Sequence, residues 1–273
     1  MAIHPTAVVS PEAVIGRNVT IGPYSVVEDH VTIGNDCHID AHVKIARHTS
    51  IGDRSRIYFG SLIGEEPQDH RFKPGTVAYT QIGSDTTIRE YVTIHRSPFE
   101  NGCTRVGDHT LLMAFVHVGH DAQIGNYVTC ANHTAISGHV IIEDGAVLSG
   151  YIMIHQFCRI GALAMLAAGS KIRQDVPPYC MLSENSFICG ANIVGMRRAG
   201  LESETRSAIR RAIKIYFFKG LNGTNAIGEI RAKADTPETG KFIKFIQDST
   251  RGIVDPDPDL LAIGLHRNLE DED

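Results

Sequence analysis

An aliphatic residue returns at every sixth position over most of the chain, and this period constrains the fold more than any other feature. An α-helix repeats every ~3.6 residues and an ordinary strand about every two, so neither produces a period of six. The period is typical of a parallel β-helix of hexapeptide repeats, in which three short strands and their turns make one coil. The first run is Ile3, Val9, Ile15, Ile21, Val27, Ile33, Ile39, Ile45, Ile51, Ile57 and Ile63. The second is Ile82, Ile88, Ile94, Val106, Leu112, Val118, Ile124, Cys130, Ile136, Ile142, Leu148, Ile154, Ile160, Leu166 and Ile172.

Three hexapeptides make a coil of about 18 residues, so residues that far apart should stack roughly 4.8 Å from one another. Each buried aliphatic then contributes on the order of 1.5–3 kcal/mol, and stacking of about ten coils supplies the stability. A glycine often follows the aliphatic, as at Gly16 and Gly107, where we expect a tight turn. The period slips across residues 64–81 and is broken by Glu100. Both places predict loops outside the coil, and such loops usually carry function.

The period stops after Ile172, and the sequence QDVPPY at 174–179 is expected to end the solenoid, because two prolines cannot continue a paired ladder. We predict a β-helix domain over residues 1–190, an α-helical domain over 191–254 and an acidic, disordered tail over 255–273. An apolar stripe at Ile209, Ile213 and Phe217 predicts a helix with Ser203 as its cap. Two shorter helices are expected near 225–234 and 237–248.

Composition is that of a globular protein without a membrane span or a secretion signal, and it favours a cytoplasmic location. The six cysteines show no paired spacing, which favours reduced thiols. The net charge of −5 hides an asymmetry, because the tail is strongly acidic and residues 197–219 are basic. The basic helix face could be plain solvated surface, or it could bind an acidic partner or a phosphate. A patch this local does not indicate nucleic-acid binding. Its residues are Arg206, Arg210 and Lys214.

Histidines crowd the second half of the solenoid. With an 18-residue coil, His120 lies beside Gly138, and Gly138 beside Gln156, while His139 and His155 are within one position of this column. We therefore expect three imidazoles to converge on one edge, next to the Gly138 backbone N–H. His120 could be a general base oriented by Asp121, the imidazoles could bind Zn²⁺, or they could be surface histidines. The zinc alternative is weakened because Gly138 and Gln156 occupy positions where further ligands would stand.

Seven motifs occur in order and with compatible spacing, and through them the chain resembles the UDP-N-acetylglucosamine O-acyltransferases of lipid A synthesis. The similarity runs from residue 1 to about 252. The motifs, with x for any residue, are VTIHR at 92–96, LLM at 111–113, HxxHD at 117–121, GH at 138–139, IHQFC at 154–158, QDVPPY at 174–179 and NIxGMxR at 192–198.

The resemblance implies a left-handed β-helix, a homotrimer and active sites between neighbouring subunits. It implies transfer of an (R)-3-hydroxyacyl group from acyl carrier protein to the glucosamine 3-hydroxyl of UDP-N-acetylglucosamine, without a metal or other cofactor. His120 would be the general base, Asp121 its partner and the Gly138 N–H the oxyanion donor. Acyl carrier proteins are acidic, so the basic helix face gains a partner. The substrate-binding positions would be Asp69, Arg71, His117, His139, His155, Gln156, Ala168, Asn192 and Arg198.

Four positions depart from the family pattern. Arg71 stands where the family commonly has Lys, and Arg keeps the charge but not the shape. Val194 replaces a frequent Glu, and Ala199 replaces a second basic residue, which leaves open a 3-amino sugar acceptor and an amide product. Ala168 stands where a Gly leaves room for the acyl tail, so we expect shorter acyl chains. Two other classes remain as alternatives, a zinc carbonic anhydrase of the same fold and a non-catalytic scaffold.

Overall fold

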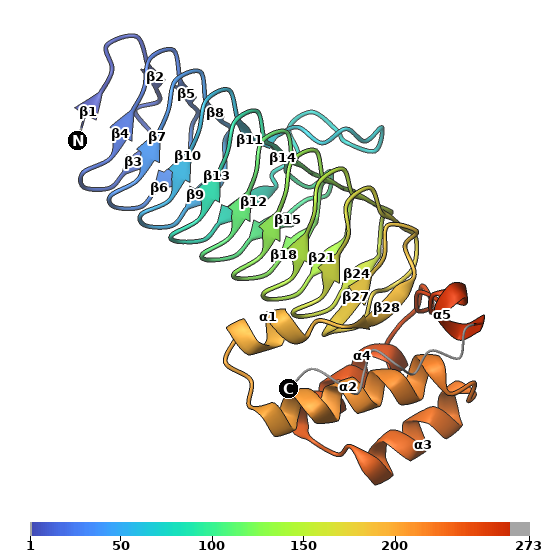
Figure 1. Ribbon diagram of the computed structural model, residues 1–273. Helices are drawn as coiled ribbons and strands as arrows, with labels where there is room; N and C mark the ends of the chain where they lie inside the picture. The colour runs from blue at the N-terminus through green and yellow to red at the C-terminus, as the bar shows by residue number, and fades with distance from the viewer. Residues whose placement is uncertain (1, 263–273) are drawn as a thin grey trace.

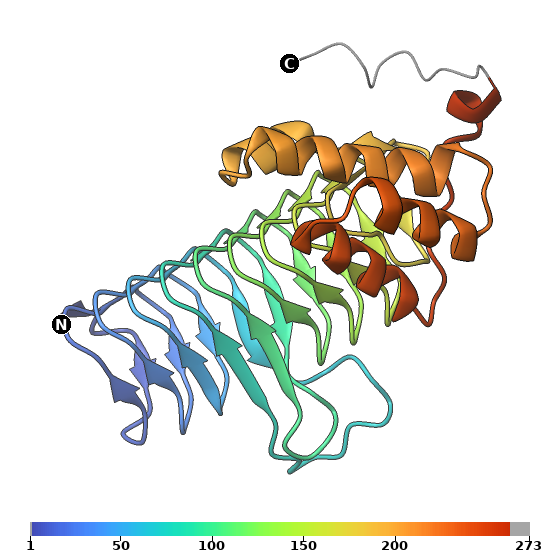
Figure 2. The same ribbon diagram turned by 90° about the horizontal axis from the view of Figure 1, so that it is seen from below.

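The computed structural model describes residues 2–262 of the protein, and Figures 1 and 2 show a long solenoid with helices packed at its C-terminal end. The solenoid consists of three sheets that we name A, B and C. Sheet A contains β1 (Ala2–Ile3), β4 (Thr20–Ile21), β7 (His38–Ile39), β10 (Arg56–Ile57), β13 (Thr87–Ile88), β16 (Leu111–Leu112), β19 (Thr129–Cys130), β22 (Val147–Leu148), β25 (Met165–Leu166), β27 (Cys180–Leu182) and β28 (Ile188–Ala191). Sheet B contains β2 (Val8–Val9), β5 (Val26–Val27), β8 (Lys44–Ile45), β11 (Leu62–Glu65), β14 (Thr93–His95), β17 (His117–Val118), β20 (Ala135–Ile136), β23 (Met153–Ile154) and β26 (Lys171–Ile172). Sheet C contains β3 (Val14–Ile15), β6 (Thr32–Ile33), β9 (Thr49–Ile51), β12 (Tyr79–Ile82), β15 (Cys103–Val106), β18 (Gln123–Ile124), β21 (Ile141–Ile142) and β24 (Arg159–Ile160).

Paired residues in uninterrupted coils are 18 positions apart, as the sequence period predicts. The separation rises to 31 where Ile57 pairs with Ile88 and to 24 where Ile88 pairs with Leu112. Two loops account for this, one between β11 and β12 and one between β14 and β15. We call them the long loop (66–78) and the short loop (96–102). Both leave the solenoid where sheet B leads to sheet C, at what we call the BC corner, so both predicted loops are confirmed and share one edge.

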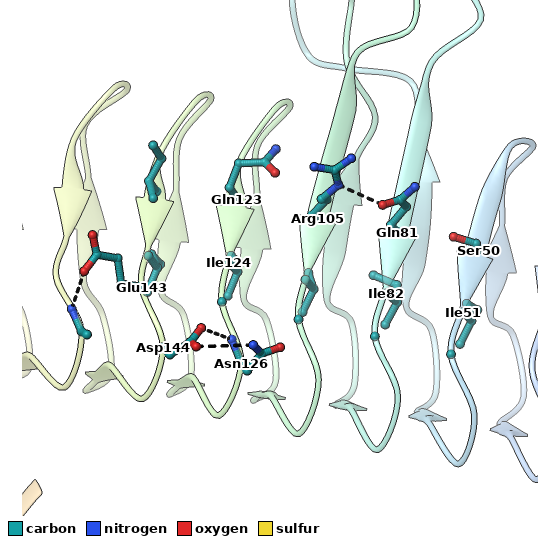
Figure 3. A pocket seen from close by; sticks show the side chains of 18 residues that line it. Ser50, Ile51, Gln81, Ile82, Arg105, Gln123, Ile124, Asn126, Glu143 and Asp144 are labelled. Carbon is teal, nitrogen blue, oxygen red and sulfur yellow. Dashed lines mark hydrogen bonds between the residues drawn. The ribbon is translucent and has the colours of Figure 1, made fainter. Parts of the chain in front are cut away.

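The outer face of sheet C carries a shallow groove of about 860 Å³, part of which Figure 3 shows. Side chains from five successive strands line it, and in Figure 3 Arg105 reaches Gln81 through a hydrogen bond of 2.9 Å. The lining residues include Gln123 and Glu143 but none of the clustered histidines. The histidine cluster is therefore at the neighbouring corner and not in this groove.

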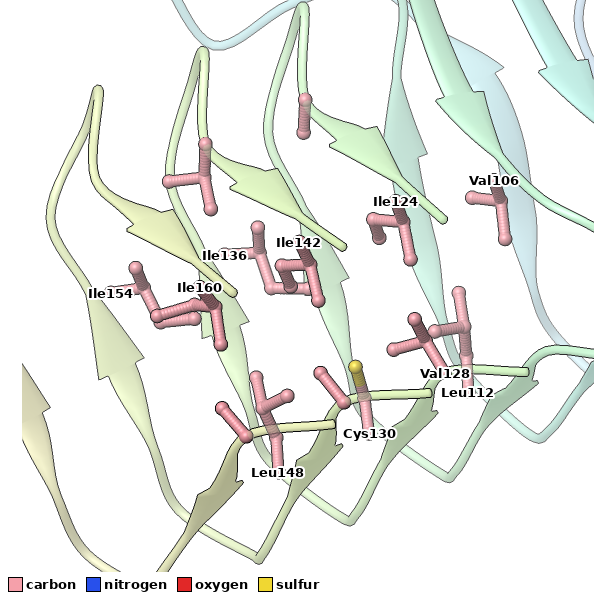
Figure 4. Close-up of a cluster of buried hydrophobic side chains, with 14 of the residues drawn as sticks. Val106, Leu112, Ile124, Val128, Cys130, Ile136, Ile142, Leu148, Ile154 and Ile160 are labelled. Atoms are coloured by element: carbon pink, nitrogen blue, oxygen red, sulfur yellow. The ribbon is translucent and has the colours of Figure 1, made fainter. Parts of the chain in front are cut away.

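The predicted aliphatic ladders fill the interior between the three sheets (Figure 4). Ile57, Ile63 and Ile94 are completely buried, and Cys130 takes a ladder position between Leu112 and Leu148. Burial raises the pKa of the Cys130 thiol to about 12, so this cysteine behaves as a small apolar core residue. All six cysteines are free, in agreement with the predicted reduced state.

The glycines that follow the core aliphatics are not required by tight turns, as we expected, but by another constraint. Most of them, such as Gly16 and Gly107, do not have positive φ; a Cβ at either would lie 2.6 Å from the backbone of the next coil. They are required by the close approach of successive coils. The left-handed conformation occurs two residues further on, at non-glycine positions such as Tyr24, Tyr91 and His133. Rings at these turns stack from coil to coil.

The C-terminal region begins later than the two prolines suggest, because β27 still pairs with β25 in parallel after Pro178. An antiparallel strand, β28, then leads into the helices. The helix at 203–218 starts at Ser203, but Glu202 is its N-cap and no side chain caps it, so the prediction of a Ser203 cap is wrong. The helices are α1 (Ile193–Arg198), α2 (Ser203–Phe218), α3 (Gly223–Lys233), α4 (Pro237–Gln247) and α5 (Pro258–Ala262).

The start of the predicted disordered tail is ordered. The backbone of Ile188 in β28 bonds to Asp255 and Asp257, and α5 follows directly. Backbone pairing to β28 holds these residues despite their charge. Residues 263–273, the rest of the predicted tail, lie outside the described residues.

Candidate active site

The BC corner brings together segments from four successive coils. The long loop, the short loop, the turn after β17 and the turn after β20 all leave sheet B at this edge. Because parallel coils stack in register, the side chains of these four segments lie beside one another. They include the predicted base His120, its neighbour Asp121, and Gly138 and His139 from the next coil.

His120 and Asp121 form a hydrogen-bonded pair. Nδ1 of His120 lies 2.8 Å from Oδ2 of Asp121, and both side chains are 14% exposed. An ionised carboxylate can only accept, so Nδ1 carries the proton and Nε2 of the neutral ring is left as an acceptor. The backbone N–H of Asp121 donates to Oγ1 of Thr104, at 2.8 Å, which fixes the turn. The corner thus presents an imidazole whose Nε2 is the acceptor nitrogen.

Gly138 lies directly against the ring of His120. A Cβ at this position would stand 2.6 Å from Nε2 of His120 and 2.7 Å from Cε1, so any other residue would displace the imidazole. At the corner between sheets C and A, the N–H of the same repeat position donates to a side chain of the next coil, as Asn35 does to Asp53 and Asn126 to Asp144. The Gly138 N–H has no acceptor among residues 2–262. It remains available to a ligand that reaches His120.

The long loop places an ion pair opposite the base. Arg71 forms bidentate hydrogen bonds to Asp69, and Oδ2 of Asp69 lies 3.4 Å from Nε2 of His120. The Arg71 guanidinium holds the pKa of the Asp69 carboxyl well below its usual range. The carboxyl groups of Asp69 and Asp121 lie on either side of the ring, an arrangement that stabilises an imidazolium once it forms.

The neighbouring histidines are held neutral. Burial, with a smaller contribution from His95, lowers the pKa of His117 to about 4. Nδ1 of His117 lies 2.9 Å from Oγ1 of Thr93. Burial also lowers the pKa of His139, although Asp121 lies 3.8 Å away. Neutral imidazoles around His120 can donate or accept hydrogen bonds without adding charge.

The predicted convergence of three imidazoles is only partly correct. The rings of His120 and His139 meet at 5.0 Å, edge to face. The next ring in the column is Phe157, stacked on His139 at 4.7 Å, and not His155. His155 is exposed, with its Nδ1 3.2 Å from Nη2 of Arg251. The reason is register: Phe157 shares the repeat position of His139, and His155 stands two residues earlier, at the end of β23. Gln156 is exposed beside it.

The structure places the remaining predicted binding residues elsewhere in the chain. Ala168 is exposed in the turn from sheet A to sheet B, which we call the AB corner, one corner away from His120. Asn192 is the N-cap of α1, where its side chain accepts from Gly195 N and donates to Leu163 O. Arg198 is exposed at the end of α1, and Val194 is exposed in its first turn.

On α2, the predicted partner-binding residues lie on a half-buried face. The guanidinium of Arg206 donates to Leu201 O, at 2.6 Å. Arg210 and Lys214 follow at one-turn spacing, so the three cations share the face that the sequence predicts.

Sequence reasoning missed several residues of this corner. Arg96 and Phe99 of the short loop and Thr104 of β15 contact the site, but their positions follow no repeat. Phe157 could have been found, because it stands 18 residues after His139 and 36 after Asp121 at the same turn position. The loop residues gave no periodic signal.

The zinc alternative retains some donors. Ligand atoms of His120, Asp121 and His139 lie within 4.8 Å of one another. However, Nδ1 of His120 already bonds to Asp121, and the expected third imidazole, His155, is not in this group. The corner thus has fewer histidine ligands than the three-histidine zinc site requires.

None of the helices within residues 2–262 has the length and hydropathy needed to cross a bilayer.

The coil and its corner define a class: hexapeptide-repeat transferases. Residues 30–65 match the family model described as bacterial transferase hexapeptide (six repeats), and residues 175–254 match the model described as UDP N-acetylglucosamine O-acyltransferase, domain 2. The acyl-(acyl-carrier-protein)–UDP-N-acetylglucosamine O-acyltransferase of Halorhodospira halophila is 44% identical over 92% of this chain and 98% of that protein. The same enzyme of Campylobacter concisus is 37% identical over 92% of this chain and 96% of its own.

Solved structures agree. The UDP-N-acetylglucosamine acyltransferase of Bacteroides fragilis superposes with a TM-score of 0.89 at 39% identity, covering 92% of this chain and 99% of that one. The Francisella novicida acyltransferase superposes with a TM-score of 0.88 at 35% identity, over 95% and 96% of the two chains. The chain belongs to the UDP-N-acetylglucosamine O-acyltransferase family, and its fold is the predicted left-handed parallel β-helix followed by helices.

Proposed function

We propose that the protein transfers an (R)-3-hydroxyacyl chain from acyl carrier protein to the 3-hydroxyl of UDP-N-acetylglucosamine, the first step of lipid A synthesis. The observation that carries this proposal is the arrangement at the BC corner, where the His120 ring, with Nε2 3.4 Å from Asp69, lies against Gly138, whose N–H has no acceptor among residues 2–262. A base and an oxyanion donor side by side are what acyl transfer to a hydroxyl requires. Relatives that carry this activity in their names match over most of the chain.

In this mechanism Nε2 of His120 removes the proton of the sugar 3-hydroxyl as the oxygen attacks the thioester carbonyl. The Gly138 N–H donates to the oxygen of the tetrahedral intermediate. The intermediate collapses to the ester and expels the carrier thiolate, which takes the proton back from the imidazolium. Asp121 keeps the ring oriented and, with Asp69, stabilises its charged form. Protons balance, and no covalent enzyme intermediate forms.

The substrate positions surround this pair. We assign Asp69 and Arg71 of the long loop to the sugar and its diphosphate, because Arg71 supplies an exposed cation next to the base. His117 of β17 and His139 of the next coil are neutral hydrogen-bonding groups. His155 and Gln156 extend the surface toward the C-terminal end. Asn192 and Arg198 would contact the nucleotide, and Ala168 would limit the acyl tail.

These positions suggest a trimer with sites between subunits. Ala168 lies at the AB corner and His120 at the BC corner, with sheet B between them. Residues at two different corners of one solenoid cannot enclose one small substrate. Residues at the AB corner of one copy and at the BC corner of another copy can. We therefore place each site between two protomers of a homotrimer, closed by rotational symmetry.

The basic face of α2 offers a docking surface for acyl carrier protein. Its residues Arg206, Arg210 and Lys214 are positively charged and attract an acidic partner, which favours association at low salt. Six free cysteines fit a reducing compartment, so we place the enzyme in the cytoplasm.

A competition assay tests the proposal. Purified protein is mixed with (R)-3-hydroxyacyl carrier proteins of several chain lengths, and UDP-N-acetylglucosamine and its 3-amino analogue are offered together. Mass spectrometry should find the O-acylated sugar. Ala168→Gly should shift the preference toward longer chains. An amide as the main product would show that the 3-amino analogue is the preferred acceptor. The absence of any product from folded protein would contradict the proposal.

A further inference from the structure

The side chains around His120 form a closed ring of contacts that includes one residue with no assigned role. His120 lies 3.4 Å from Asp69, Asp69 is paired with Arg71, and the Arg71 guanidinium lies 5.0 Å from the ring centre of Phe99. Phe99 in turn lies 6.4 Å from the ring of His139, which meets His120 edge to face. Phe99 of the short loop thus closes the circle from the long loop back to the catalytic turn.

The orientation of Arg71 depends on both of its contacts. Nε and Nη2 are bonded to Asp69, whereas Nη1 donates to no residue of the described chain. The Arg71 side chain is 55% exposed, and a long exposed side chain has many rotamers unless something holds it. Phe99 provides the second contact that restrains the Arg71 side chain, because a guanidinium stacks on an aromatic face. The free Nη1 is then presented at a fixed place beside the base.

This pairing also explains why arginine stands at position 71. A lysine ammonium could neutralise Asp69, but it has no planar fork to bond Asp69 through two nitrogens and lie against Phe99 at the same time. Phe99 is 42% exposed, so burial of its ring in a core is not its purpose. Arg71 and Phe99 therefore form one unit.

We propose that Phe99 is a positioning residue for the nucleotide sugar: its ring holds Arg71 so that Nη1 donates to the substrate diphosphate. The inference rests on the proposed function, because it takes an anionic nucleotide sugar as the ligand. Phe99 acts through Arg71 and does not itself touch the reacting atoms. A positioning residue of this kind changes the affinity for the sugar more than the rate of the chemical step.

The test is a double-mutant cycle with Phe99→Leu and Arg71→Lys. Leu keeps an apolar side chain but removes the π face. With saturating acyl donor, Phe99→Leu should raise KM for UDP-N-acetylglucosamine about two- to fivefold, the factor of one exposed cation–π contact, and leave kcat within about twofold. Phe99→Tyr should restore the wild-type KM. Arg71→Lys should raise KM in the wild-type background and have a much smaller effect in Phe99→Leu.

A matched control is Tyr127→Leu, which removes an exposed ring stacked on His109 at 4.7 Å, at the corner between sheets C and A. Its KM should equal that of the wild type. Unchanged KM in Phe99→Leu would overturn the inference, and so would equal effects of Arg71→Lys in both backgrounds. If Phe99→Leu does not fold, Phe99→Ile makes the same comparison. Absence of any acylated sugar with wild-type protein contradicts the proposed function instead.

Discussion

Gly138 and His120 constrain each other at the BC corner. The imidazole occupies the space that a Cβ on residue 138 would need, and the Gly138 N–H has no acceptor in the part of the chain that the structure describes. One glycine thus provides room for the base and a donor for the oxyanion. At the turns after sheet C, glycines such as Gly107 allow the close approach of two backbones.

Gly138→Ala should therefore damage catalysis more than folding. The new methyl group displaces His120 and shields the N–H, and loss of an oxyanion donor alone costs roughly 10²–10³ in kcat. The control is Gly228→Ala in α3, where a Cβ meets no atom within 4 Å. It should keep full activity and gain about 0.5–1 kcal/mol of helix stability. Both are read from kcat and from urea unfolding; a Gly138→Ala enzyme with wild-type kcat would contradict this account of the corner.

His117 should make stability depend on pH. Its pKa is about 4 in the folded protein against an ordinary 6.5, so the unfolded chain binds the proton first as pH falls. Stability from this residue is complete above about pH 6.5 and decreases toward pH 4, by about 2 kcal/mol at pH 5. His117→Gln cannot titrate, so the difference in unfolding free energy between wild type and variant should move by that amount between pH 7 and pH 5. An unchanged difference would show that burial does not depress this pKa.

At the scale of elements, the long loop is held by Arg96 of the short loop. The Arg96 side chain donates to Gly64 O, forms an ion pair with Glu66 and lies over the ring of Phe72. Arg96 is only 5% exposed, so these contacts fix the start of the loop that carries Asp69. Positioning of the long loop thus depends on a residue of the next coil.

Arg96→Lys should loosen that loop. Lysine cannot reach Gly64 O and Glu66 with separate nitrogens, so amide hydrogen exchange in residues 66–78 should become faster. Exchange in β18, two coils further along sheet C, should stay as in the wild type. The acyl-transfer rate of Arg96→Lys should also be lower than that of the wild type. Equal exchange rates in residues 66–78 of the wild type and the variant would contradict the prediction.

The regular elements could be predicted closely from the sequence and the irregular ones could not. The period of six predicts Ile94 and Ile136 as core residues, and both are completely buried. Residues 255–262 are ordered because residues 255–257 pair with β28, and no local sequence pattern predicts this pairing. Likewise the contact of Phe99 with Arg71 joins two loops whose conformations depend on tertiary packing.

For the site, stacking arithmetic was sufficient for His120, Gly138 and His139, which stand at fixed places in adjacent coils. It misplaced His155, because a shift of two residues moves a side chain from the turn column to the end of a strand. Roles such as that of Arg198 follow from family likeness, and they remain predictions.

At the scale of the whole molecule, the proposed placement of each site between two protomers can be tested by mixing subunits. His120→Ala and Arg198→Ala should each lower activity. If a site takes His120 from one protomer and Arg198 from its neighbour, co-expression of the two variants should give mixed trimers with about a quarter of wild-type activity. Co-expression of His120→Ala with Asp121→Ala, both at one corner, should give no recovery. Equal results from the two mixtures would place the whole site in one chain.

The most direct test of the central claim is the single-turnover rate of acyl transfer by wild type and His120→Ala, with both substrates saturating. The account predicts a loss of about 10²–10⁴ in rate, with the affinity for UDP-N-acetylglucosamine nearly unchanged. The control His38→Ala removes an exposed imidazole on sheet A and should keep the wild-type rate. A His120→Ala rate within about threefold of wild type would contradict the assignment of His120 as the general base.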